Sequence, residues 1–153
     1  MKSLIIYYSK YKNNTEKIAK AFADKINADL INLNNPDRVN FDFDIGNYSL
    51  IGFGSGVYNE SLSPTLFNLV ENLDLKGKNV FAFSTSCVGL KLYNKKLIKI
   101  LASKGAICKG SFASKGGFTF KGNKIFEILS KRSEGHPNDE DIIKAIAFIK
   151  TVI

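Results

Sequence analysis

Three consecutive segments near the start of the chain decide the fold: LIIYY (residues 4–8), SKYKNNT (9–15) and EKIAKAF (16–22). The first is a continuous apolar run, which is typical of a strand buried on both faces of a sheet. The third begins a helix, because its apolar residues recur at helical spacing. The polar segment between them therefore opens onto the positive end of a helix, a position that favours anion binding.

The polar segment lacks the two best-known nucleotide-binding motifs. It contains neither G-x-x-x-x-G-K-[ST], which binds a triphosphate, nor G-x-G-x-x-G, which binds a dinucleotide. No cluster of aspartates follows the strand, as a magnesium-dependent phospho-accepting domain would need. Hydroxyl, amide and backbone N–H donors remain, and these suit a single phosphate monoester. The alternative is that Asn14 and Thr15 only cap the helix.

The rest of the chain repeats the alternation of strands and helices. Further strands are expected at 30–33, 48–54, 79–84 and 106–113, the last interrupted at Gly110, and helices after Pro64, before Gly105, at 125–129 and from Asn138 onward. Residues 37–47 are interpreted as an irregular connection whose Phe41, Phe43 and Ile45 cover the sheet. The alternation predicts an α/β fold, because parallel strands need crossover connections. We expect one domain, residues 1–153, with a doubly wound five-stranded parallel sheet in the order 2-1-3-4-5 and helices on both faces.

Length, composition and charge indicate what class of protein the sequence encodes. A chain of 153 residues with 44% hydrophobic content can form one core. Its net charge is +8, but the lysines are scattered, so a solvated lysine surface is the simplest interpretation, and acidic partners, nucleic acid or a membrane surface are the alternatives. Without a signal-peptide pattern or a transmembrane-length segment, we expect a reduced, cytoplasmic monomer without membrane insertion. Cys87 is then a free thiol, and Cys108 is placed in the core.

In the expected topology, ligands bind at the carboxyl ends of the strands, where the first and third strands diverge. The loops that leave the first, third and fourth strands should converge there, joined by a glycine-rich connection after the fifth. Glycines let the backbone approach a flat ligand, and Tyr58 can stack on one. Taken alone, each later segment also fits an ordinary turn. The candidate binding residues are Ser9, Lys10, Tyr11, Asn13, Asn14, Thr15, Gly54, Ser55, Gly56, Val57, Tyr58, Ser84, Thr85, Ser86, Cys87, Gly117 and Phe118.

A Tyr-Ser strand end followed by S-x-x-x-x-N-T and E-K-I-A resembles the phosphate loop of the flavodoxin family, which binds flavin mononucleotide (FMN). The loop is one residue longer than usual and places Asn13 where small residues are common; asparagine tolerates left-handed backbone. The tail EGHPNDED, residues 134–141, is similar to a segment of short-chain members. Unlike well-known members, the chain is basic and has no Trp. The resemblance therefore implies FMN stacking on Tyr58, assisted by Phe118 or Tyr11.

The resemblance implies an FMN-binding carrier that shuttles electrons between redox partner proteins, which the basic surface predicts to be acidic. In this hypothesis the Gly56–Val57 peptide turns on one-electron reduction, a change that glycine makes sterically easy. One alternative is a flavin-dependent enzyme of the same fold, a quinone reductase or a protoporphyrinogen oxidase. Another is a basic nucleic-acid or interaction module without flavin, although no nucleic-acid-reading motif supports it. No catalytic or metal-binding residue is assigned: His136 is interpreted as structural, and Cys87 has no nearby histidine in sequence to activate it.

Overall fold

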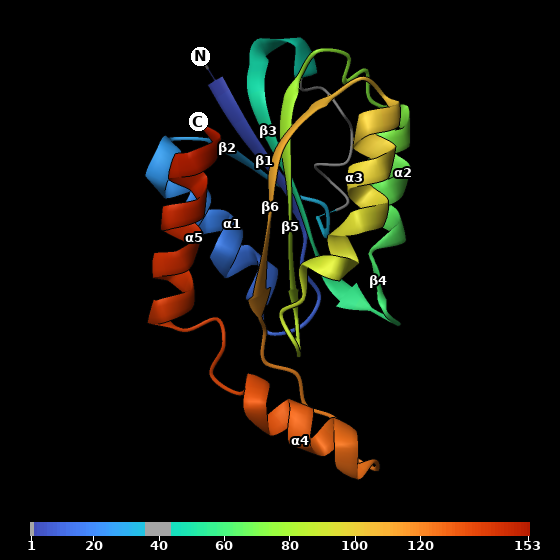
Figure 1. Ribbon diagram of the computed structural model, residues 1–153, viewed down its shortest axis with the longest axis vertical. Coiled ribbons are helices and arrows are strands. Elements are labelled where there is room, and N and C mark those ends of the chain that lie inside the picture. The colour runs from blue at the N-terminus through green and yellow to red at the C-terminus, as the bar shows by residue number, and fades with distance from the viewer. Residues whose placement is uncertain (1, 36–43) are drawn as a thin grey trace.

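The computed structural model describes residues 2–35 and 44–153. It is a three-layer structure in which a mostly parallel sheet lies between two layers of helices (Figure 1). The elements are β1 (Lys2–Tyr8), α1 (Asn14–Ile26), β2 (Asp29–Asn32), the 3₁₀ helix η2 (Ile45–Asn47), β3 (Tyr48–Tyr58), β4 (Ser61–Leu62), α2 (Pro64–Asn72), β5 (Asn79–Ser86), the 3₁₀ helix η3 (Lys91–Asn94), α3 (Lys95–Ser103), β6 (Ile107–Lys115), α4 (Lys124–Ser133) and α5 (Asp139–Val152).

The strand order is β2-β1-β3-β5-β6, and all four pairings along it are parallel. Since β5 and β6 are the fourth and fifth parallel strands, the predicted order 2-1-3-4-5 is confirmed. A sixth strand, β4, was not expected; it pairs antiparallel with the end of β3. The turn between them is Asn59-Glu60, with φ of 50° and 63°. Positive φ at both positions is what a two-residue hairpin requires, but only the asparagine is a common residue there.

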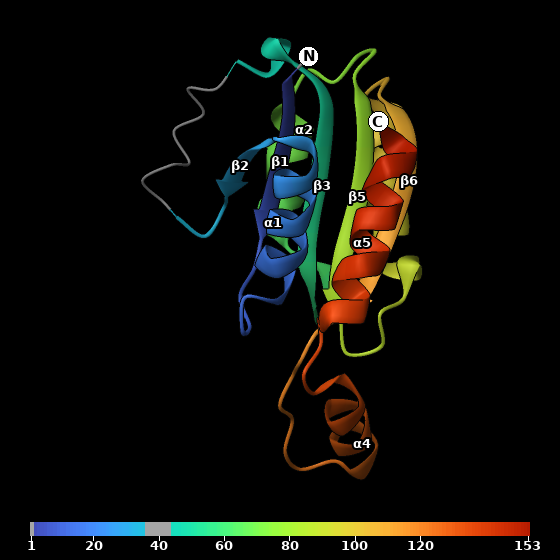
Figure 2. The same ribbon diagram turned by 90° about the vertical axis from the view of Figure 1, so that its left-hand side faces the viewer.

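The two faces of the sheet carry different cores. Helices α1 and α5 cover one face, and α2 and α3 cover the other (Figures 1 and 2). The α1 and α5 face is rich in phenylalanine: the ring of Phe22 lies 5.1 Å from that of Phe83 and 5.5 Å from that of Phe81, both edge-on. The other face is mainly aliphatic, with Ile51, Leu66 and Val80 among its buried residues. Together the two cores bury both faces of the central strands, as the continuous apolar runs predicted.

Strands β3 and β5 are longer than the sequence indicated. Residues 55–58, predicted as a loop, continue β3, and Thr85 and Ser86, predicted as the start of an exit loop, continue β5. The reason lies in long-range pairing: Gly56 is in register with Thr85 of β5, and Val57 with Leu62 of β4. Both predictions of loop structure are therefore wrong.

The register of β6 shifts where the sequence predicted an interruption. Val80 of β5 faces Cys108 while Phe81 faces Gly110, so Lys109 is an extra residue in the edge strand. Cys108 is exposed, which corrects its placement in the core. Cys108 is exposed because it lies in the edge strand, next to the bulge, where neighbouring elements do not cover its side chain.

Helix α4 lies in the crossover from β6 to α5, beyond the carboxyl ends of the strands (Figure 1). It is twice as long as the predicted helix at 125–129 and is capped by the preceding Asn123, whose side chain accepts a hydrogen bond from the N–H of Ile125. Ile45 packs partly buried against the core, whereas Phe41 and Phe43 of the predicted connection lie outside the described residues. Within the described part of the chain, no helix has both the length and the apolar character needed to cross a membrane.

Candidate functional site

The segment 9–15 turns the chain from β1 into α1 at the carboxyl edge of the sheet. Lys12 and Asn13 adopt left-handed backbone, with φ of 48° and 53°, so the conformational reason given for Asn13 is correct. The N–H of Ser9 donates to Oδ1 of Asn34 at 2.8 Å, and the N–H of Glu16 donates to the Ser9 hydroxyl at 3.4 Å. The bend is therefore fixed at its base, next to the first turn of α1.

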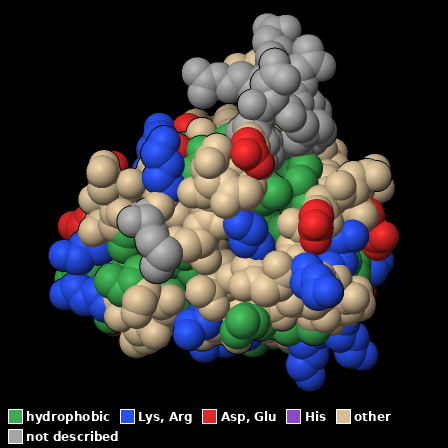
Figure 3. Space-filling model, turned by 90° about the horizontal axis from the view of Figure 1, so that it is seen from above, with side chains coloured by type: hydrophobic (Ala, Val, Ile, Leu, Met, Phe, Trp, Pro, Cys, Tyr) green, Lys and Arg blue, Asp and Glu red, His purple; other side chains and the backbone are tan. Residues whose placement is uncertain are grey.

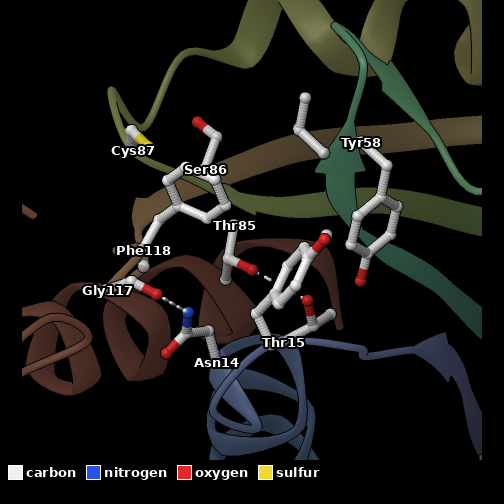
Figure 4. Close-up of a pocket in the computed structure, with 12 residues that line it drawn as sticks. Asn14, Thr15, Tyr58, Thr85, Ser86, Cys87, Gly117 and Phe118 are labelled. Carbon is white, nitrogen blue, oxygen red and sulfur yellow. Dashed lines mark hydrogen bonds between the residues drawn. The ribbon is translucent and has the colours of Figure 1, made fainter. Parts of the chain in front are cut away.

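Asn14 and Thr15 do not act as simple helix caps. The Asn14 side-chain amide donates to the carbonyl of Gly117 at 2.8 Å, and the Thr15 and Thr85 hydroxyls share a hydrogen bond of 2.8 Å (Figure 4). Both side chains are buried. Buried polar groups of this kind hold the start of α1, the end of β5 and the segment after β6 in one arrangement.

Tyr58 folds back over its own strand. Its hydroxyl accepts a hydrogen bond of 2.8 Å from the N–H of Lys10, which ties β3 to segment 9–15. A Cβ added to Gly56 would lie 2.5 Å from the Tyr58 hydroxyl, so the glycine leaves room for this conformation. Burial of the phenol raises the pKa of Tyr58 to about 12, and the hydroxyl is neutral at physiological pH.

Aromatic rings enclose a small cavity between these segments. The ring of Tyr11 lies 5.7 Å from that of Tyr58 and 5.5 Å from that of Phe118. The cavity measures about 40 Å³, comparable with the share of liquid volume of one water molecule, about 30 Å³. Its lining residues are Tyr11, Asn14, Thr15, Gly56, Val57, Tyr58, Thr85, Ser86, Cys87, Gly116, Gly117 and Phe118.

The structure thus brings together eleven of the seventeen candidate residues, and their role in binding stays a prediction. Ser9, Lys10 and Asn13 lie in the same bend, outside the lining. The sequence missed Gly116, where a Cβ would lie 2.8 Å from the Asn14 amide nitrogen. The Gly-Gly pair after the fifth strand was the available signal, because adjacent glycines often mark close backbone approach.

The other three candidates outside the lining are Gly54, Ser55 and Ser84. They lie inside the sheet: Gly54 and Ser84 are at the predicted ends of strands that continue past them, and Ser55 is in the part of β3 that was not predicted as strand. Gly54 packs against the ring of Phe83, and a Cβ there would lie 2.1 Å from it. Ser84 is buried, and its hydroxyl has no hydrogen-bond partner among the described residues.

Ser55 makes local hydrogen bonds instead. Its hydroxyl donates to the carbonyl of Gly56 at 2.6 Å and accepts from the N–H of Ser63 at 2.9 Å. Ser55 therefore links the Gly56 carbonyl to the backbone at Ser63, the residue that precedes α2.

The surroundings of Cys87 and His136, to which no catalytic role was assigned, are described by the structure. Burial raises the pKa of the Cys87 thiol, which disfavours the nucleophilic thiolate. His136 is structural, as predicted: its Nδ1 lies 2.5 Å from a carboxylate oxygen of Asp141, and its backbone carbonyl accepts a hydrogen bond from the N–H of Gly117 at 2.8 Å. His136 thereby positions the segment that forms one wall of the cavity.

The donors and aromatic walls fit a phosphate-bearing flavin, but the cavity is too small for its rings. Of the residues that the structure describes, those lining the cavity include neither Asp nor Glu, which suits an anion. Ligand pockets usually measure about 300–1,000 Å³, so a ring system requires the walls to separate. Tyr11 is 44% exposed and can swing outward, whereas Tyr58 is held by Lys10 and by its strand. A bound ring would therefore displace Tyr11 more easily than Tyr58.

The sequence matches a family model described as a flavodoxin domain over residues 4–107. The chain belongs to the flavodoxin family. It is 39% identical over 155 residues to the uncharacterized protein MJ0298 of Methanocaldococcus jannaschii, covering 100% of this chain and 99% of that protein. The matched range contains segment 9–15, β3 and β5, but ends before the wall at Gly116–Phe118 and before α4.

Solved structures of other proteins share the fold. A flavodoxin from the domain Archaea superposes with a TM-score of 0.66 at 14% identity, covering 98% of this chain and 95% of that one. General stress protein 14 of Treponema denticola, solved in complex with FMN, gives a TM-score of 0.62 at 11% identity over 100% of both chains. At these identities the likeness establishes the fold alone.

Proposed function

We propose that this flavodoxin-family chain binds FMN and carries electrons between redox partner proteins. The observation that supports this most is the left-handed bend at Lys12-Asn13, which opens onto the start of α1 directly beside an aromatic-walled cavity. A phosphate binds well at such a helix start, and an aromatic ligand binds well between such rings. The FMN complex of the Treponema denticola structural relative supports the same assignment.

Different segments of the chain would contact different parts of the flavin. Residues 9–15 would hold the phosphate through backbone N–H groups and the side chains of Lys10, Lys12 and Asn13. Tyr58 would form the fixed ring wall, and Tyr11 and Phe118 the movable ones. FMN itself supplies the redox chemistry, while the protein binds it, orients it and excludes water from it.

The predicted turn of the Gly56–Val57 peptide meets a specific resistance. The Gly56 carbonyl accepts the Ser55 hydroxyl at 2.6 Å, and Val57 is paired with Leu62 of β4. Turning the peptide would break the first contact, so Ser55 stabilises the present orientation. Structures of the oxidised and reduced protein with this peptide unmoved would refute the hypothesis.

The assignment is tested by titrating apoprotein with FMN and with riboflavin, following the loss of flavin fluorescence. We expect FMN to bind at least about tenfold more tightly than riboflavin, because only FMN offers a phosphate to residues 9–15. Lys12→Ala should reduce this preference, whereas Lys150→Ala, an exposed change on α5, should leave it unaltered. Failure to take up FMN, or equal affinity for both flavins, would overturn the proposal.

Steady-state turnover distinguishes an electron carrier from a flavin-dependent enzyme. A carrier accepts electrons through a reductase protein and shows little steady-state quinone reduction with a nicotinamide donor alone. Rapid turnover under those conditions would replace the carrier assignment with that of a flavin-dependent quinone reductase.

A further inference from the structure

The segment from Thr119 to Glu134, which contains α4 and is called the α4 arm here, exposes an unusual amount of apolar surface. Residues 119–128 are all exposed. Among them, Ile125 is 69% exposed, Ile128 54% and Phe126 49%. Scattered apolar side chains are normal on a protein surface, but a cluster of this kind on one short element marks an interaction site.

The α4 arm is continuous with the cavity wall. Phe118, which lines the cavity, stacks with Phe120 at 6.1 Å between ring centres, and Phe120 lies 4.9 Å from Phe126 of α4. In Figures 1 and 2, α4 projects beyond the carboxyl ends of the strands, at the same end of the molecule as the cavity. A protein that covers the α4 arm therefore also approaches the proposed flavin site.

The charge of the α4 arm identifies the kind of partner. It carries four cations, Lys121, Lys124, Lys131 and Arg132, against two carboxylates. Seen from the opposite end of the molecule, basic side chains are spread among acidic and polar ones (Figure 3). A second copy of this chain would bring like charges together, because each copy has the same cationic arm and a net charge of +8. An acidic surface instead complements it.

We propose that the α4 arm is the docking surface for an acidic partner protein, which covers Ile125, Phe126 and Ile128 with an apolar patch and pairs its carboxylates with Lys121 and Lys124. The apolar contacts provide most of the affinity, and the surrounding charges accelerate and orient association. The identity of the partner as a redox protein rests on the proposed function; the docking itself does not.

The test measures binding of an acidic ferredoxin to the full chain by biolayer interferometry at low and high salt, with basic cytochrome c as the comparison protein. We expect the ferredoxin to bind and its affinity to fall with added salt, and cytochrome c to bind at least about tenfold more weakly. Ile128→Asp and Lys124→Glu should each weaken ferredoxin binding about tenfold.

The controls are matched changes at the far end of the sheet, where β6 begins. Ile107 is 53% exposed, close to the 54% of Ile128, and Lys109 is an exposed lysine of the same strand. Ile107→Asp and Lys109→Glu should change the affinity less than about twofold, within ordinary surface effects. Circular dichroism of each variant checks that it is folded.

Several outcomes would overturn the proposal: no ferredoxin binding at low salt, tighter binding of cytochrome c, or equal losses in the control variants. Light scattering that shows self-association abolished by Ile128→Asp would instead assign the α4 arm to a second copy. Sedimentation with phosphatidylglycerol vesicles, without ferredoxin binding, would assign it to a membrane surface. The FMN titration of the same samples is independent, so ferredoxin binding without FMN uptake would support docking while refuting the electron carrier.

Discussion

Segment 9–15 and the α4 arm lie at the same end of the molecule but are built in opposite ways. The first contains buried polar side chains, Asn14 and Thr15, whose hydrogen bonds lead to other segments. The second presents large apolar side chains to solvent and is attached where the Ser130 hydroxyl donates to the carbonyl of Phe118. Polar groups are buried and apolar groups are exposed, the reverse of what stability alone favours. The difference supports the two proposals, a ligand at segment 9–15 and a partner protein at the α4 arm.

The largest expected difference between the two parts concerns stability. Phe22→Ala, in α1 behind segment 9–15, should lower the free energy of unfolding by about 3–5 kcal/mol, because it opens a cavity among four other phenylalanines. Phe126→Ala in the α4 arm should lower it by less than about 1 kcal/mol, since half of that side chain is already in water. Urea unfolding measures both, and comparable losses would show that the α4 arm belongs to the cooperative core.

A smaller difference in stability is expected between alanine variants of two asparagines, one in each part. Asn14→Ala should cost about 1–3 kcal/mol, because it leaves the buried carbonyl of Gly117 without its donor. Asn123→Ala removes an exposed cap of α4 and should cost at most about 1 kcal/mol. Hydrogen exchange sharpens the comparison: Asn14→Ala should accelerate exchange of the Gly117 amide, and Asn123→Ala should affect α4 alone. The reverse pattern would contradict the role given to Asn14.

The smallest effect concerns proton binding by Tyr58. Its pKa is raised from 10.0 to about 12, mainly by burial, so the folded protein keeps a proton that the unfolded chain loses in this interval. The associated stability is present below pH 10 and is lost as the pH rises through about 12. Tyr58→Phe should abolish a tyrosinate absorbance step near pH 12, which Tyr93→Phe retains. Persistence of that step in Tyr58→Phe would assign it to another tyrosine.

The fold, and the meeting of the predicted loops around one cavity, followed from the sequence because both depend on simple periodicity. Alternating strands and helices fix a parallel sheet, and the topology then places segment 9–15 beside the ends of the third and fourth parallel strands. The extent of those strands could not be predicted, because β3 reaches Tyr58 only through pairing with β4 and β5. Ser55 was assigned to the site for this reason, and Gly54 and Ser84 because the predicted strands end at them.

Exposure was harder to predict than position. Cys108 reads as a core residue and is exposed, since a bulge and a missing neighbour strand leave that part of β6 uncovered. The pattern at 125–129 predicts a short helix, but hydrophobic residues in a helix ordinarily indicate burial. Only the three-dimensional arrangement shows that Ile125 and Ile128 face water.

The hairpin between β3 and β4 is a site where the chain can accept inserted residues. Tyr58 is carried by a strand, and the two residues after it, Asn59 and Glu60, form the exposed tip of that hairpin. Extra residues inserted at this tip would extend outward while the ladder below kept its register. A protein of this design can therefore acquire a longer rim beside the cavity through a single insertion.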